Sequence, residues 1–280
     1  MIDLPKLIEQ ANDLQPLPAS TVRLAWVAAN PDCDLSEIVQ PVEFDQVLTL
    51  KMLRAANSVV SASETPVGNV HEAVLRMGTV QVLAFAVGAS TRPYLQGPVP
   101  GYGMAEGALW RHSVAAAAAM ETMGSCGIAV PPNAVTAALL HDIGKLVLNR
   151  FLSQEILGFI QRARTADGLT LVEAESQLLG VNHAELGGLI AQHWKLPPEV
   201  VSGITWHHFP DQGGEPICDL TCAANQIAKH IEATLDGGKF TLEVPPGVAE
   251  RLSLSPPTLE YLCLAAMSRY LDVSRQYNAA

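Results

Sequence analysis

Apolar residues recur at helical spacing along almost the whole chain, and this pattern limits the possible folds more than any other feature. Residues 47–56 are an example, with apolar side chains at Val47, Leu48, Leu50, Met52, Leu53 and Ala56. No alternation of β-branched residues extends beyond a few positions, so the sequence predicts no β-strands. We therefore expect an all-α fold in the form of a multi-helix bundle with an N-terminal helical subdomain.

Capping residues divide this pattern into a series of helices. Asp34 followed by Glu37 makes a capping box, and Ser20 and Asp45 are suited to N-cap positions. After a first helical run over Leu4–Ala11, the expected helices lie at about 20–29, 35–40, 46–56, 71–89, 104–123, 132–149, 150–166, 170–179, 183–194, 197–207, 217–234 and 256–276.

Two stretches between these helices are predicted connections. Residues 92–103 contain three prolines and three glycines, which makes this stretch the clearest linker. Residues 209–216 are expected to form a loop. No repeat period is evident, so a solenoid of stacked repeats is not expected.

Composition and charge exclude several classes of protein. Hydrophobic residues make up 49% and charged residues 16% of the 280 residues, which is typical of a globular chain. The formal net charge of −11 disfavours non-specific binding to nucleic acid, and no Lys/Arg run suggests a membrane surface. The N-terminus lacks the basic and apolar segments of a signal peptide, and the apolar run Val114–Met120 is too short to span a bilayer. We expect a cytoplasmic protein.

The five cysteines are odd in number and scattered along the chain. Cys218 and Cys222 stand four residues apart, as a pair of metal ligands would. No second cysteine pair accompanies them, so we interpret them as small buried residues of a reduced protein.

The dipeptide His141-Asp142 is the strongest sign of chemistry, because imidazole and carboxylate are good ligands for divalent cations. The apolar run Ala137–Leu140 before it would bury this part of the helix and keep the pair in a low-dielectric environment. Gly144 would allow a neighbouring element to approach closely. Lys145 is suited either to contact a phosphate oxygen or to lie at the surface with its aliphatic stem packed.

Four further histidines stand on other predicted helices. His112 lies early in the Ala-rich helix, His183 begins a later one, and His207-His208 end another. Each could be a hydrogen-bonded core residue, yet together with His141 and Asp142 they form a candidate set of metal ligands. Imidazole and carboxylate suit iron, manganese and zinc alike, so the sequence predicts one or two divalent ions of unresolved identity.

In this order, these residues resemble the HD superfamily of metal-dependent phosphohydrolases. The superfamily has a histidine, then His-Asp, then a histidine, often a His-His doublet, and an aspartate within Ala-Asp-x-x-Ala. His112, His141, Asp142, His183, His207 and His208 match the first elements. Asn225 stands where the aspartate is expected, so it is a weaker candidate ligand that offers a neutral carbonyl oxygen.

The N-terminal half resembles the HDOD family, the HD-related output domain of bacterial signalling proteins. The matching segments are Leu17–Ser20, Asp34–Val39, Leu48–Ser58 and Glu72–Gly78, and the resemblance covers about residues 7–210. The Gly-Tyr-Pro signature of the related cyclic-di-GMP phosphodiesterases is absent after His208.

The resemblance implies an HD-type helical bundle with three parts. Residues 1–100 would form the N-terminal helical part, 101–235 the HD-like core with the His/Asp cluster, and 236–280 a C-terminal helical extension.

Two functions follow from the resemblance. The first is a regulatory protein of bacterial signalling that acts by contact with one or more partner proteins. The second is a phosphohydrolase acting on a phosphate ester or nucleotide, with Asp142 and Lys145 as catalytic residues and a metal-bound hydroxide as the nucleophile. We rank the regulatory function first, because Asn225 and the missing Gly-Tyr-Pro segment both weaken the case for hydrolysis.

Overall fold

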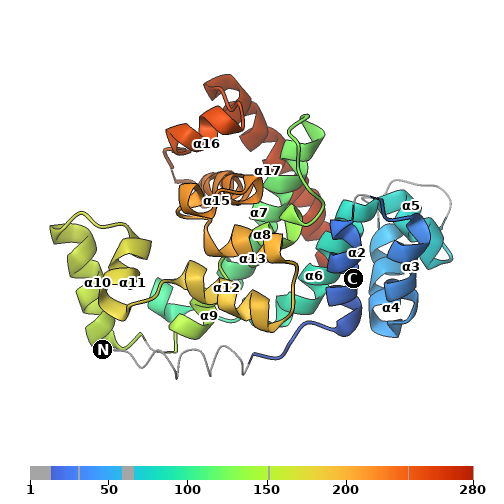
Figure 1. The fold of residues 1–280 in the computed structure, drawn as a ribbon, viewed down its shortest axis with the longest axis horizontal. Coiled ribbons are helices and arrows are strands. Elements are labelled where there is room, and N and C mark those ends of the chain that lie inside the picture. The colour runs from blue at the N-terminus through green and yellow to red at the C-terminus, as the bar shows by residue number, and fades with distance from the viewer. Residues whose placement is uncertain (1–13, 31, 59–65, 151, 239, 280) are drawn as a thin grey trace.

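The computed structural model describes residues 14–279 except 31, 59–65, 151 and 239, and it consists of packed helices (Figure 1). The α-helices are α2 (Ala19–Ala29), α3 (Leu35–Glu43), α4 (Gln46–Ala56), α5 (Val70–Met77), α6 (Thr79–Leu95), α7 (Ala108–Ser125), α8 (Ala134–Leu140), α9 (Gly144–Leu148), α10 (Gln154–Ala166), α11 (Leu171–Leu179), α12 (His183–His193), α13 (Pro198–Thr205), α14 (Pro210–Gly213), α15 (Pro216–Leu235), α16 (Pro246–Arg251) and α17 (Pro256–Ala279).

The all-α prediction is confirmed for the described residues, which contain an isolated bridge between Val99 and Met104 but no strand. The run predicted over Leu4–Ala11 lies outside the described residues.

Side-chain caps explain where several of these helices begin. Asp34 accepts a hydrogen bond from the Glu37 backbone at 3.0 Å in the predicted capping box of α3. Asn182 and Glu185 form the same motif at α12, with Asn182 Oδ1 3.0 Å from the Glu185 nitrogen. This second box matters for the site, because it fixes the first turn of the helix that starts at His183.

The N-cap prediction for Ser20 was wrong, and that for Asp45 was correct. Pro18 precedes α2, so Ser20 lies inside the helix, where its hydroxyl donates to Asp45 Oδ2 at 2.6 Å. The other Asp45 oxygen accepts from the Leu48 nitrogen at 2.9 Å and caps α4. Asp45 therefore joins the start of α4 to α2.

The single helix predicted over 71–89 is two helices, α5 and α6, which meet at an angle of 110°. The chain turns at Gly78, whose φ of 77° and ψ of 158° lie in a region that favours glycine. Within the described residues no individual helix has the length and apolarity needed to cross a membrane. The bent pair α5–α6 meets that requirement jointly, by length and composition only.

The predicted linker over 92–103 begins later than expected. Helix α6 continues through Pro93 to Leu95, although proline has no N–H to bond the carbonyl four residues earlier. The chain then forms a 3₁₀ turn at Pro100–Tyr102, between the two residues of the Val99–Met104 bridge.

The helix predicted over 132–149 is interrupted where the His-Asp pair stands. Helix α8 ends at Leu140 and α9 begins at Gly144. In between, the Ile143 nitrogen donates to the Leu140 carbonyl at 2.9 Å and the Lys145 nitrogen to the Asp142 carbonyl at 3.0 Å. Each of these bonds joins residues three positions apart, as in a 3₁₀-helix, so the backbone is wound more tightly here than in an α-helix. His141 and Asp142 therefore do not have the orientation that an ideal α-helix would give them.

Helix α7 forms the centre of the bundle and packs against α8, α15 and α17 (Figure 1). Its run Ala115–Ala119 is buried, and these small side chains let the neighbouring helices approach closely. The helices α2 to α5 lie together on one side of this centre, while α10 and α11 project on the opposite side.

The C-terminal helix α17 is attached to α6 through Tyr277. The ring stacks on Phe85 with centroids 5.3 Å apart, and the hydroxyl donates to the Ala84 carbonyl at 2.7 Å. We expect Tyr277→Phe to lower the free energy of unfolding by about 1 kcal/mol, since the ring is kept and one buried hydrogen bond is lost. Urea denaturation measures this change, and an unaltered midpoint would show that the hydroxyl contributes nothing.

Candidate metal centre

Histidine, aspartate and asparagine side chains from several elements meet in one buried cluster. The contributing elements are α7 (His112), the turn between α8 and α9 (His141 and Asp142), the first residue of α12 (His183), the turn after α13 (His207 and His208) and α15 (Asn225). Each of these residues except His208 is at most 3% exposed, and His208 is partly exposed. The structure thus brings together every residue that the sequence singled out as a ligand.

Part of the cluster surrounds one oxygen of Asp142, and we call it the His112 group: His112, His141, Asn225 and Asp142 Oδ2. His112 Nε2 lies 3.1 Å from His141 Nε2 and 3.2 Å from Asn225 Oδ1. The Asp142 Oδ2 atom lies 3.5 Å from His112 Nε2 and 3.6 Å from His141 Nε2.

The other part surrounds the second oxygen, and we call it the His183 group: His183, His207, His208 and Asp142 Oδ1. His183 Nε2 lies 3.0 Å from His208 Nε2 and 3.2 Å from Asp142 Oδ1. His207 Nε2 is 3.9 Å from the same oxygen. One nitrogen from each of the three histidines falls within 4.8 Å of the others, a spacing at which they could share one ion.

Outer groups fix which nitrogen each histidine presents to the cluster. Glu175 Oε2 accepts from His183 Nδ1 at 2.6 Å, and Glu232 Oε2 accepts from His112 Nδ1 at 2.8 Å. Backbone carbonyls do the same for His141 and His207, at 2.8 Å and 2.7 Å. In all four rings Nδ1 is engaged outward and Nε2 faces inward, as in metal sites whose ligands are oriented by a second layer of acceptors.

Electrostatics keep several of these rings in the neutral form that binds metals. Burial lowers the pKa of His141 to about 3 and holds the pKa values of His207 and His208 well below the ordinary value. Burial also disfavours a charged His183, but Glu175 and Asp142 together outweigh burial and raise the pKa of that ring. A metal ion at His183 therefore has to displace a proton.

Asp142 supplies the negative charge of the cluster. Burial opposes its ionisation, yet the neighbouring Lys145 ammonium and the histidines hold its pKa well below the usual range. Lys145 Nζ donates to Asp142 Oδ2 at 2.5 Å and also lies 5.5 Å from the centre of the Tyr102 ring. Lys145 is thus held against the cluster, which excludes the interpretation as a simple surface lysine.

The chemistry of these residues fits a divalent metal ion. Asp142 Oδ1 and His207 Nε2 are buried acceptors that meet no hydrogen-bond donor among the described residues. A buried acceptor without a donor is destabilising, and a cation satisfies it. Imidazole nitrogens and carboxylate oxygens are ordinary ligands of zinc, iron and manganese, so the cluster could hold such an ion.

Gly144 allows α9 to pack closely against α12, as the sequence suggested. A Cβ atom on Gly144 would stand 2.0 Å from the His183 carbonyl oxygen and 2.7 Å from the Gly187 nitrogen. Only glycine therefore permits α9 to lie this close to α12, and this contact places His183 beside Asp142.

Sequence reasoning missed four residues around the cluster. Glu175 and Glu232 orient histidines, Tyr102 lies edge-on to His183 with ring centres 6.3 Å apart, and Lys229 of α15 stands close enough to interact with Asp142 and His208. No local pattern marks them. Lys229 and Glu232 follow Asn225 by four and seven residues on α15, spacings that put all three on one helical face and that were an available signal.

Cys218 and Cys222 do not belong to the cluster. Both are buried, and Cys218 Sγ lies 3.6 Å from the Ser202 carbonyl oxygen. Burial raises the pKa of Cys222 to about 12, so its thiol stays protonated. These properties agree with the interpretation as small buried residues.

A comparison with protein families decides the affiliation of the chain. The family model described as the HDOD domain matches residues 14–210. The chain belongs to the HDOD domain family. It is also 26% identical over 233 residues to an uncharacterized protein of Treponema pallidum (strain Nichols), a match that covers 81% of this chain. The chain spans 44% of that relative's length.

Solved structures share the fold. An HDOD domain protein of unknown function from Geobacter sulfurreducens has 22% identity and a TM-score of 0.62, with 97% of this chain and 94% of that chain covered. A protein from Marinobacter aquaeolei VT8, provisionally described as a signal transduction protein, has 20% identity and a TM-score of 0.72, with 99% and 64% covered. A protein from Shewanella amazonensis SB2B, provisionally described as a phosphohydrolase, has 26% identity and a TM-score of 0.59, with 93% and 98% covered.

Proposed function

We propose that this HDOD protein is a regulatory component of bacterial signalling, which acts through contacts with a partner protein and holds a divalent metal ion in its HD-like core. One observation supports the metal: Asp142 Oδ1 and His207 Nε2 are buried acceptors in the middle of a histidine cluster, and neither meets a donor among the residues that the structure describes. The burial of the cluster supports a regulatory role, because a catalytic ion needs a position open to its substrate. We place the protein in the cytoplasm, which agrees with the unpaired cysteines.

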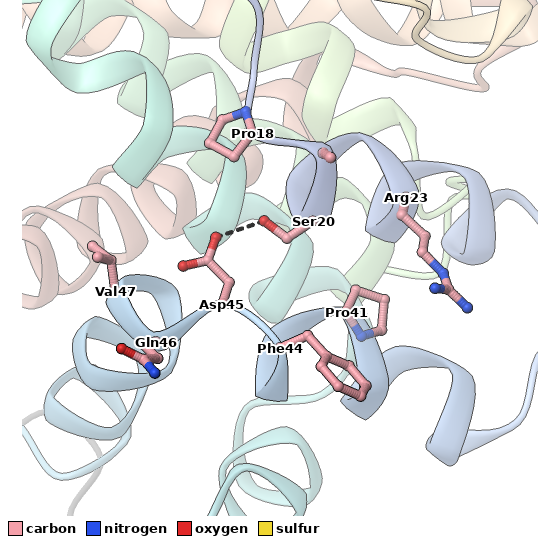
Figure 2. A pocket seen from close by; sticks show the side chains of 9 residues that line it. Pro18, Ser20, Arg23, Pro41, Phe44, Asp45, Gln46 and Val47 are labelled. Atoms are coloured by element: carbon pink, nitrogen blue, oxygen red, sulfur yellow. Dashed lines mark hydrogen bonds between the residues drawn. The ribbon is translucent and has the colours of Figure 1, made fainter.

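The surface formed by α2, α3 and α4 supports contact with a partner protein. Phe44 is 82% exposed and Val47 64% exposed, and both line a pocket of about 630 Å³ together with Pro18 and Pro41 (Figure 2). Figure 2 shows that these side chains come from neighbouring helix ends joined by the Ser20–Asp45 hydrogen bond. Adjacent exposed apolar side chains of this kind are typical of interaction surfaces.

Hydrolysis of a phosphate ester is the second candidate function, and the cationic edge of the cluster favours it. Lys145 and Lys229 are both partly exposed beside His208, which is itself the least buried of the candidate ligands. An ion here would lower the pKa of a bound water and offset charge on phosphoryl oxygens. The two lysines would then position an anionic ester.

A pair of parallel assays separates these functions. We expect the immobilised protein to retain a specific partner from a lysate of its source cells, and Phe44→Ala/Val47→Ala to lose it. Leu264→Ala is the matched control, since Leu264 is 69% exposed on α17, outside this surface. In the second assay, bis(p-nitrophenyl) phosphate with Mn²⁺ should show no turnover that depends on Asp142. Turnover abolished by Asp142→Ala, with partner retention unaffected by the Phe44 variant, would favour the hydrolase instead.

A further inference from the structure

The geometry points to a single metal ion, bound in the His183 group, with the Lys145 ammonium in place of a second ion beside the His112 group. This inference rests on the metal site proposed above and specifies how many ions it holds and where. It separates residues that bind the ion from residues that merely lie near it.

In the His112 group, the buried side-chain atoms of His112, His141 and Asn225 have hydrogen-bond partners without a metal. His141 Nδ1 faces the Ala138 carbonyl, which only accepts, so Nδ1 carries the hydrogen and Nε2 of the neutral ring carries the lone pair. His112 Nε2 in turn lies within hydrogen-bonding distance of His141 Nε2 at 3.1 Å and of Asn225 Oδ1 at 3.2 Å. No buried side-chain atom of this group, among those described, lacks a hydrogen-bond partner apart from Asp142 Oδ1, which faces the other group.

The charge of the His112 group is also balanced. Asp142 Oδ2 already accepts from Lys145 Nζ at 2.5 Å. An ion bound to Oδ2 by a bond of about 2.1 Å would stand within about 5 Å of that ammonium, and the two cations would repel each other. Asn225 adds no negative charge to reduce this repulsion.

The His183 group, in contrast, contains buried acceptors without a hydrogen-bond donor among the described residues. His207 Nδ1 donates to the Ile204 carbonyl, so its Nε2 carries a lone pair, and no donor in the described part of the chain reaches that nitrogen. Asp142 Oδ1 likewise has no hydrogen-bond partner among the described residues, although His183 Nε2 lies 3.2 Å away. Two acceptors of this group, His207 Nε2 and Asp142 Oδ1, therefore lack a donor among the described residues, and the nitrogens of His183 and His208 lie beside them.

The distances in the His183 group suit four ligands around one ion. The separations of 3.0 Å between His183 Nε2 and His208 Nε2, and of 3.2 Å and 3.9 Å from Asp142 Oδ1 to the two nearest nitrogens, bracket the spacing of ligands that each lie about 2.0–2.1 Å from a metal. Three nitrogens and one oxygen make a ligand set that zinc accepts readily.

Zinc titration of the intact chain tests this assignment. The protein is stripped with a chelator, titrated with Zn²⁺ in a calorimeter, and analysed for zinc after gel filtration. We expect about one zinc per chain, loss of that zinc in His207→Ala and in His208→Ala, and its retention in Asn225→Ala and in His112→Ala. Two zinc ions per wild-type chain, or retention in His207→Ala with loss in Asn225→Ala, would overturn the assignment.

A variant expected to gain a metal ion tests the same assignment without removing a histidine, so the test does not depend on the folding of the histidine variants. Lys145→Met removes the ammonium group beside Asp142 Oδ2, and Asn225→Asp places a carboxylate in the His112 group. The double variant should therefore bind two zinc ions. A single zinc in that variant would overturn the role given to Lys145. Absence of zinc from the wild-type chain would contradict the proposed metal site itself, which is a different result from binding two.

Discussion

Asp142→Ala is expected to abolish metal binding and to lower the free energy of unfolding of the metal-free protein by about 3–5 kcal/mol. The reason is that Asp142 is 1% exposed and is the counter-charge of Lys145, whose side chain is 13% exposed. Removing one partner of a buried ion pair leaves the other without compensation. Urea denaturation with chelator present measures the stability change, and elemental analysis measures the metal.

Two further variants show whether the unpaired lysine causes this loss. Asp142→Ala/Lys145→Met should recover part of the stability without recovering the metal, since no buried charge is left unpaired. Asp272→Ala is the matched control, because Asp272 forms an exposed pair with Arg275 at 3.4 Å, and its loss should change stability by less than about 1 kcal/mol. An Asp142→Ala protein as stable as the wild type would contradict this account of the cluster.

Gly144→Ala is expected to have the second large effect, a loss of about 3 kcal/mol in stability together with weaker metal binding. The added methyl group would meet the His183 carbonyl oxygen and the Gly187 nitrogen, and backbone atoms cannot move aside as a side chain can. The clash would push α12 from α9 and carry His183 away from Asp142. Thermal denaturation and zinc titration report the two consequences.

Gly158→Ala provides the control for Gly144→Ala. Gly158 lies inside α10, where a new Cβ atom would stand 3.8 Å from the Arg162 guanidinium. This substitution should leave stability unchanged or raise it by about 0.5–1 kcal/mol, because alanine favours helix over glycine. A Gly144→Ala protein that behaves like Gly158→Ala would show that the close approach of α9 and α12 does not depend on glycine.

The sequence indicated which polar side chains would lie together, because residue type alone carries much of that information. Histidines and a His-Asp pair at the ends of apolar helices have few alternatives once the helices pack, and the structure brings His112, His183 and Asp142 to within hydrogen-bonding or ion-pairing distances. The capping box at Asp34 is a local motif and was predicted for the same reason.

The remaining features depend on tertiary contacts that a sequence pattern does not express. The turn at residues 141–143 interrupts a stretch whose apolar pattern continues unbroken into α9. Glu175 is fully buried although glutamate normally favours the surface, because His183 is its partner. Helix α16 was not expected at all, since a run of six residues is too short to show a helical period.

The division of the cluster also lay beyond sequence reasoning. The order of residues suggested one set of ligands around one or two ions. The structure shows that Asp142 turns one oxygen toward Lys145 and the other toward His183. Only coordinates reveal which acceptors lack a donor, and those acceptors decide where an ion belongs.

Anomalous diffraction from crystals of protein purified without chelators tests the central claim most directly. A divalent metal in the core predicts one anomalous peak about 2.0–2.2 Å from His183 Nε2, His207 Nε2 and Asp142 Oδ1. Crystals soaked with Zn²⁺ should show the same peak. A map without any peak inside the histidine cluster, in soaked crystals as well as untreated ones, would contradict the account.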